Sequence, residues 1–222
     1  MRVRHYVLLF AVLFAFSDAR SWSPSDTPDA PVRQPTPGCG ALGSRPGALG
    51  PLDYRTTPQR TIDFVEIRHF TRAVETLKHG ERSGDVPSDI EFMLGVFPNH
   101  PRALRSAAAV IRRNGGKVPN GLVYGIHCWF DRAIAFRPDD ADVRIVYAYE
   151  LLRDRKEAEA REQALESEPF ASSARVQYNL GLVFFELKDF ERSLLYAKKA
   201  YEAGFDLPGL RNKLQQAGQW RE

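Results

Sequence analysis

Apolar side chains recur at steps of three and four residues along most of the chain beyond residue 68. This spacing puts them on one side of an α-helix, whereas a half-buried strand would alternate apolar and polar residues. Helical spacing is clearest in four runs: Ala103, Leu104, Ala107, Ala108 and Ile111; Leu122, Ile126, Phe130, Ala133 and Ile134; Ile145, Val146, Tyr149 and Leu152; and Tyr178, Leu182, Phe185 and Leu187. Alternating patterns are absent, so the sequence predicts an all-α fold.

Prolines separate these runs. Pro98, Pro138, Pro169 and Pro208 follow one another at intervals of 40, 31 and 39 residues. Helices of roughly a dozen residues, interrupted about every 34 residues, are typical of stacked helix pairs. The chain is therefore expected to form an α-solenoid within residues 69–222.

Several short motifs resemble the tetratricopeptide repeat (TPR) family. Gln177-x2-Leu180-Gly181-x2-Phe184 resembles the first-helix half of a repeat, and Phe130-x2-Ala133-x4-Pro138 resembles the end of its second helix. The segments 136–141 and 97–101 resemble the connection between repeats. The resemblance covers residues 88–207, with Gln177 and Ala197 standing where the family usually has an aromatic residue.

This resemblance implies about three degenerate TPR-like helix pairs with a capping helix at each end. The caps are expected near Val74–His79 and Pro208–Ala217, with Leu207, Leu210, Leu214 and Trp220 facing inward. Small residues such as Gly181 let neighbouring helices approach closely. The expected repeat-packing positions are Phe130, Ala133, Pro138, Leu180, Gly181, Phe184 and Ala200. As a class, the chain resembles exported bacterial TPR proteins, which implies a role in protein–protein interaction.

The first 19 residues have the pattern of a secretory signal peptide. Arg2 and Arg4 precede an uncharged run from Tyr6 to Phe16, and small residues around Ala19 suit a cleavage site. Eleven residues are too few for a bilayer core, which needs about 20. We expect an exported protein, periplasmic or secreted, with no membrane span left after cleavage. An uncleaved membrane tether is the alternative.

Residues 20–51 are expected to be a flexible linker, because the 29 residues from Ser23 to Pro51 contain seven prolines and five glycines. Residues 52–68 are expected to form an ordered arm over the first helices. Thr56-Thr57-Pro58 prevents a helix before residue 59. The anchors of the arm are Tyr54, Ile62, Phe64, Val65 and Ile67.

The two cysteines of the chain are expected to pair. Cys39 lies in the linker and Cys128 in a predicted helix, so a disulfide would join a flexible segment to a rigid body. In an oxidising compartment, two cysteines of a mature chain are more often bonded than free.

Catalytic and metal-binding patterns are missing from the sequence. His127 and Cys128 are adjacent on a helix and point about 100° apart, so they do not form a nucleophile–base pair. The histidines lack metal-ligand spacing, and Gly115-Gly116-Lys117 lacks the strand that precedes a phosphate loop. The 31 basic and 28 acidic residues give a net charge of +3, which disfavours a nucleic-acid-binding protein. We expect no enzyme, cofactor or metal.

A row of arginines is the remaining candidate site. Arg102, Arg105, Arg112 and Arg113 lie opposite the apolar stripe of one helix, and the TPR register would place them in a concave groove. The groove would continue through Arg144, Tyr149, Arg153, Arg175, Tyr178, Asn179 and Leu182. Arginine suits an acidic peptide or an anionic glycan. We therefore expect an interaction scaffold that binds an extended protein or peptide; an accessory subunit or enzyme acting on an envelope glycan is the alternative. A solvated face balanced by nearby acidic residues is the simpler interpretation.

Overall fold

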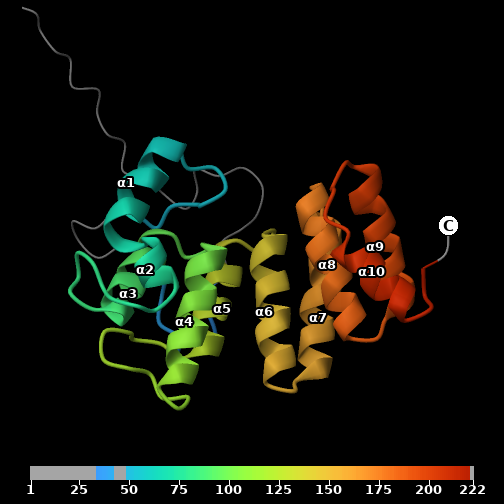
Figure 1. Cartoon of the computed structure of the whole chain (residues 1–222). Helices are drawn as coiled ribbons and strands as arrows, with labels where there is room; N and C mark the ends of the chain where they lie inside the picture. The colour runs from blue at the N-terminus through green and yellow to red at the C-terminus, as the bar shows by residue number, and fades with distance from the viewer. Residues whose placement is uncertain (1–33, 43–48, 221–222) are drawn as a thin grey trace, which may run out of the picture.

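The computed structural model describes residues 34–42 and 49–220, and within them it consists of helices without strands (Figure 1). The all-α prediction is confirmed for these residues. The predicted signal peptide, residues 1–19, lies outside them, as do residues 20–33 and 43–48 of the predicted linker. The helices are α1 (Gln59–His69), α2 (Arg72–Glu75), α3 (Val86–Val96), α4 (Pro101–Arg113), α5 (Ile126–Phe136), α6 (Ala141–Arg153), α7 (Glu157–Ser167), η2 (Glu168–Phe170), α8 (Ala174–Glu186), α9 (Phe190–Glu202) and α10 (Gly209–Gln216).

Five helices begin with a side chain that accepts a hydrogen bond from the first turn. Such a cap satisfies one of the backbone N–H groups that have no partner at a helix start. The capping residues are Asp85, His100, Asp140, Ser173 and Asp189, for α3, α4, α6, α8 and α9. The four prolines that separate the apolar runs all fall between helices or in the short turn η2. The helix boundaries therefore follow local sequence signals.

Successive helices from α6 onward pack as close antiparallel pairs. Short turns join α6 to α7 and α8 to α9, and both pairs are in extensive contact. Across the pairs, α6 lies against both α4 and α8, so α4, α6 and α8 form one layer (Figure 1). The N-terminal helix α1 packs on α3, and α10 covers the ends of α8 and α9.

The residues expected to hold the helix pairs together are in the core. Phe130, Ala133, Leu180, Phe184 and Ala200 are all completely buried, and Pro138 is partly buried. Gly181 is needed for close approach, because a Cβ there would lie 2.7 Å from Leu210 Cδ2 and 3.3 Å from the Ser193 carbonyl oxygen. Ala160 and Ala164 give α7 an equally small inward face.

The predicted arm divides into an extended part and a helix. Residues 52–58 are not helical, and the Leu52 N–H donates to the Val96 carbonyl at 2.7 Å. Helix α1 then begins at Gln59 and buries Ile62 and Val65. Phe64 and Ile67, expected as anchors, instead point outward and are 56% and 65% exposed. They occupy the side of α1 opposite its packed side.

The two caps differ from expectation in detail. The N-terminal one is a single turn, α2, instead of a helix reaching His79. At the C-terminus, α10 buries Leu210 and Leu214 completely, as expected. Leu207 lies outside α10 and is 55% exposed, so the expectation that it faces inward is wrong.

Candidate functional site

The free sides of α4, α6 and α8 form a continuous face, which we call the α4–α6–α8 face. Helical spacing opposite the buried residues puts the following side chains there: Arg102, Arg105 and Arg112 from α4; Asp142, Tyr149 and Arg153 from α6; and Arg175, Asn179, Leu182 and Glu186 from α8. Contacts between the helices show that these side chains lie on the same side of the layer. Arg112 reaches Glu150 of α6 and Asp154, which caps the C-terminus of α6, and Arg175 of α8 reaches Asp142. Most of the predicted row is therefore brought together.

On α4, two of the arginines are neutralised by carboxylates of neighbouring segments. Arg102 bonds to Glu66 at 2.7 Å and to Glu75 at 3.2 Å. Arg112 bonds to Glu150, whose side chain is only 5% exposed, and to Asp154 at 3.1 Å. These guanidinium groups hold α4 to α1, α2 and α6.

The other arginines are also engaged within the protein. Arg175 binds Asp142 through two nitrogens at 2.7 and 2.8 Å, and Arg113 donates to the Leu77 carbonyl at 3.1 Å. Arg144 is buried and bonds to Glu166, and Arg153 lies 3.8 Å from Glu150. The interpretation as a face balanced by acidic neighbours therefore describes most of the row.

Arg105 differs from the rest of the row. It is exposed and forms no salt bridge with the residues that the structure describes. Its electrostatic neighbour is Tyr149 on α6. Burial raises the pKa of the Tyr149 hydroxyl, the charge of Glu186 adds to this, and Arg105 acts in the opposite direction. Glu186, in contrast, pairs with Lys213 of α10 at 3.1 Å, so among the described arginines of the row Arg105 is the residue of the α4–α6–α8 face whose charge is left for a partner.

Tyr178 does not belong to this face, so its assignment as a groove residue needs correction. It is only 7% exposed, and its hydroxyl oxygen accepts a hydrogen bond from the Leu210 N–H at 3.1 Å. Its ring also packs against Phe205, 4.4 Å away between centroids. The cause is α10, which covers this part of α8. Leu182 is partly buried in the same cluster, and Asn179 is partly exposed.

A buried polar network, which sequence reasoning missed, joins the arm to two helix junctions. Asp53 is 3% exposed and accepts hydrogen bonds from Arg55 and from Asn99, and it pairs with Arg137 at 2.7 Å. Asn99 also donates to Asp140 at 2.8 Å, and burial raises the pKa of Asp140 to about 6. Asn99 and Asp140 lie in the two proline-containing junctions, at residues 97–101 and 136–141. The similarity of these junctions is the sequence signal that could have pointed to the network. The network fixes the arm across both connections.

A second missed cluster has catalytic residue types in a closed setting. His100 is completely buried and its Nδ1 accepts from the Ala103 N–H, so its Nε2 donates to Glu66 at 3.0 Å. Tyr54 and Arg102 donate to the same carboxylate. Burial lowers the pKa of His100, which keeps the ring neutral. Because His100 is inaccessible, the Glu66–His100 pair connects α1 to α4 and cannot reach a substrate.

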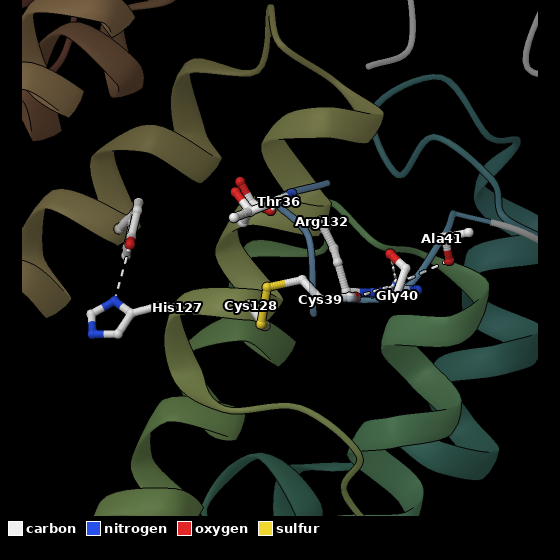
Figure 2. The surroundings of a disulfide bond; sticks show 9 residues. Thr36, Cys39, Gly40, Ala41, His127, Cys128 and Arg132 are labelled. Atoms are coloured by element: carbon white, nitrogen blue, oxygen red, sulfur yellow. Dashed lines mark hydrogen bonds between the residues drawn. A yellow bond between two sulfur atoms is a disulfide. The ribbon is translucent and has the colours of Figure 1, made fainter. Parts of the chain in front are cut away.

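Cys39 and Cys128 form the predicted disulfide, with Cα atoms 5.0 Å apart (Figure 2). Arg132, one turn further along α5, donates to the carbonyls of Cys39, Gly40 and Ala41 at 2.9–3.1 Å. The described part of the predicted linker, residues 34–42, is therefore held along α5. His127 points to another side and contacts the Tyr147 hydroxyl at 3.0 Å, so it is not paired with Cys128.

None of the helices in residues 34–42 and 49–220 is long and apolar enough to cross a membrane. The same residues contain no group of three or more His, Cys, Asp or Glu side chains arranged to hold a metal ion. No model of a protein family matches the chain, and neither a curated protein nor a solved structure matches it.

Proposed function

We propose that this chain is a non-enzymatic interaction protein with a TPR-like solenoid, and that an extended segment of a partner protein binds across the α4–α6–α8 face. The observation that carries the proposal is the alignment of three alternate helices in one layer. Such a layer offers a surface several helices long, which suits an extended ligand better than a compact one.

Two features support the repeat architecture. The pairs α6–α7 and α8–α9 are built alike, each with a 13-residue first helix and a tight turn. Their internal contacts use small residues, which are Ala160 and Ala164 in one pair and Gly181 and Ala197 in the other. At Gly181 this is the packing that the TPR motif implies.

The charges of the face favour a protein partner over an anionic glycan. A polyanionic glycan needs several unpaired cations, but Arg102, Arg112 and Arg175 already bind carboxylates of this chain. Arg105 remains for one acidic side chain of the partner, and Tyr149 beside it offers an aromatic ring. The partner segment is therefore expected to carry an acidic residue next to an apolar one.

An exported location, in the periplasm or outside the cell, is part of the proposal. The Cys39–Cys128 disulfide is compatible with an oxidising compartment. The signal-like pattern of residues 1–19 favours the same location.

A peptide-display selection tests this function. Extended random peptides selected on the full chain should be enriched in acidic–apolar pairs, and Arg105→Glu should weaken their binding about tenfold by removing one charge-assisted contact. Lys117→Glu, an exposed charge reversal in the loop after α4, is the matched control. Binding that is equal in both variants, or acidic polysaccharide binding that replaces peptide binding, would contradict the proposal.

A further inference from the structure

The outward side of α1 combines exposed apolar and cationic side chains. Ile67 is the most exposed large hydrophobic residue in the described part of the chain, at 65%, and Phe64 on the same side is 56% exposed. Arg60 and Arg68 flank them at helical spacing, opposite the buried Ile62 and Val65. The Arg68 guanidinium lies over the Phe64 ring, 3.9 Å from its centroid.

More exposed cations follow this helix in the next segment of the chain. The Arg82 N–H donates to the Arg68 carbonyl at 3.3 Å, which brings the loop after α2 next to α1. Arg72 and Lys78, in and just after α2, are exposed as well. We call Arg60, Phe64, Ile67, Arg68, Arg72, Lys78 and Arg82 the α1 surface. Its five cations form no salt bridge with any described residue.

Fewer carboxylates than cations lie close to the α1 surface. Glu66 and Glu75 both bind Arg102, whereas the exposed Glu81 accepts a hydrogen bond from the neutral Thr71 hydroxyl, at 2.7 Å, and keeps its charge. Asp63 accepts from Gln59 at 2.7 Å and is the one exposed carboxylate on α1 itself. The α1 surface is therefore positive, in contrast to the balanced α4–α6–α8 face.

We propose that the α1 surface docks on an anionic phospholipid bilayer. Phe64 and Ile67 would enter the boundary between headgroups and acyl chains, and the five cations would contact headgroup phosphates. This division of roles is that of interfacial amphipathic helices, whose long basic side chains extend to the headgroups while their stems cover apolar surface.

The shape and charge of the surface favour a bilayer over a second copy of the chain. Phe64 and Ile67 protrude, and neither lines the hollows of about 850 and 660 Å³ found elsewhere in the described part of the chain. Two copies meeting through α1 would bring like charges together. No residue is shared with the α4–α6–α8 face, so this inference stands or falls independently of the proposed function.

Vesicle sedimentation with the full chain tests the inference. We expect binding to vesicles containing phosphatidylglycerol and phosphatidylcholine, little binding to phosphatidylcholine alone, and weakening by salt. Arg60→Glu/Arg68→Glu should lower the partition coefficient by about tenfold or more at low salt. Phe64→Ser/Ile67→Ser should lower it by about tenfold even where the charges are intact.

Matched controls change exposed residues elsewhere. Lys117→Glu/Lys188→Glu reverses two other exposed cations, and Leu195→Ser/Leu207→Ser removes two other exposed apolar side chains. Both should bind like the parent. The apolar run at residues 6–16 is the same in the parent, the variants and the controls, so it cannot cause a difference in vesicle binding between them. Equal binding by all variants, no preference for anionic vesicles, or capture of polyglutamate in place of vesicles would each overturn the proposal.

Discussion

Arg112 of α4 and Glu150 of α6 form a salt bridge that joins two neighbouring helices of the same layer. The Glu150 side chain is 5% exposed, and the carboxylate of Asp154, one turn further on, contacts the same guanidinium. A carboxylate so far removed from water requires a cationic partner. The charge of Arg112 therefore holds two helices together. From the sequence, Arg112 lies opposite the apolar stripe of α4, as Arg105 does, and an exposed binding residue would lie there too.

Reversing the charge at Arg112 should therefore destabilise the protein, whereas the same change at Arg105 should not. Arg112→Glu would place three carboxylates together, one of them buried, and is expected to cost roughly 3 kcal/mol of unfolding free energy. Arg105→Glu changes an exposed residue without a salt bridge and should stay within about 0.5 kcal/mol. Urea denaturation followed by circular dichroism measures both, and equal losses would show that the described pairing is wrong.

The helices could be predicted because their signals are local. Apolar residues at three- and four-residue steps, prolines between helices and small residues such as Gly181 each act within one helix or one helix pair. Pairing of Cys39 with Cys128 needed only the number of cysteines and the expected compartment. The sequence predicts an arm in place of α1, because Phe64 and Ile67 point outward and leave this eleven-residue helix with a weak apolar period.

The polar contacts could not be predicted, because their partners lie far apart in the chain. Arg112 and Glu150 are separated by 38 residues, and Asp53 and Asn99 by 46. From the sequence, a buried arginine brace and an exposed binding arginine look the same. Which of them occurs depends on the carboxylate that the tertiary fold places opposite.

The close approach of α8, α9 and α10 at Gly181 gives a second prediction. Gly181→Leu would force its side chain against Leu210 and the Ser193 carbonyl, and overpacking of this kind costs about 1–3 kcal/mol. Gly95 on α3 has open space where its Cβ would be, so Gly95→Leu should instead stabilise by about 0.5–1 kcal/mol through helix propensity. Thermal melts of the two variants should move in opposite directions. A shift of the same sign would argue against the described packing of α10.

The Glu66 carboxylate should make stability depend on pH in the acid range. Burial by itself would raise its pKa, but hydrogen bonds from His100, Arg102 and Tyr54 outweigh burial and lower the pKa to about 2, from 4.5 in the unfolded chain. The folded state therefore binds this proton less readily than the unfolded state. Its stabilising contribution is complete above about pH 4.5 and is lost as the pH falls toward 2.

Glu66→Gln should consequently lower stability by roughly 1.5–3 kcal/mol at neutral pH, the usual value for hydrogen bonds to a charged group. It should also reduce the loss of unfolding free energy between pH 4.5 and 2, because the amide has no proton to bind in this range. The control is Asp63→Asn on the exposed side of α1, expected within about 0.5 kcal/mol of the parent. Denaturation midpoints measured across this range would contradict the interpretation if Glu66→Gln kept the acid slope of the parent.

The attachment of residues 34–42 to α5 should depend on the disulfide more than on Arg132. The bond closes a loop with a sequence separation of 89, which in the chain-entropy account is worth about 4 kcal/mol. The three carbonyls that Arg132 contacts can bind water instead, so Arg132→Ala should cost only about 1 kcal/mol. Cys39→Ser/Cys128→Ser, or treatment of the parent with a dithiol, should open this segment to proteolysis while the helices of residues 59–216 stay folded. Mass spectrometry of a limited digest identifies the cut sites, with Arg132→Ala as the comparison. Cleavage within residues 34–42 of the oxidised parent, at the rate found for the double serine variant, would show that the disulfide does not hold this segment on α5.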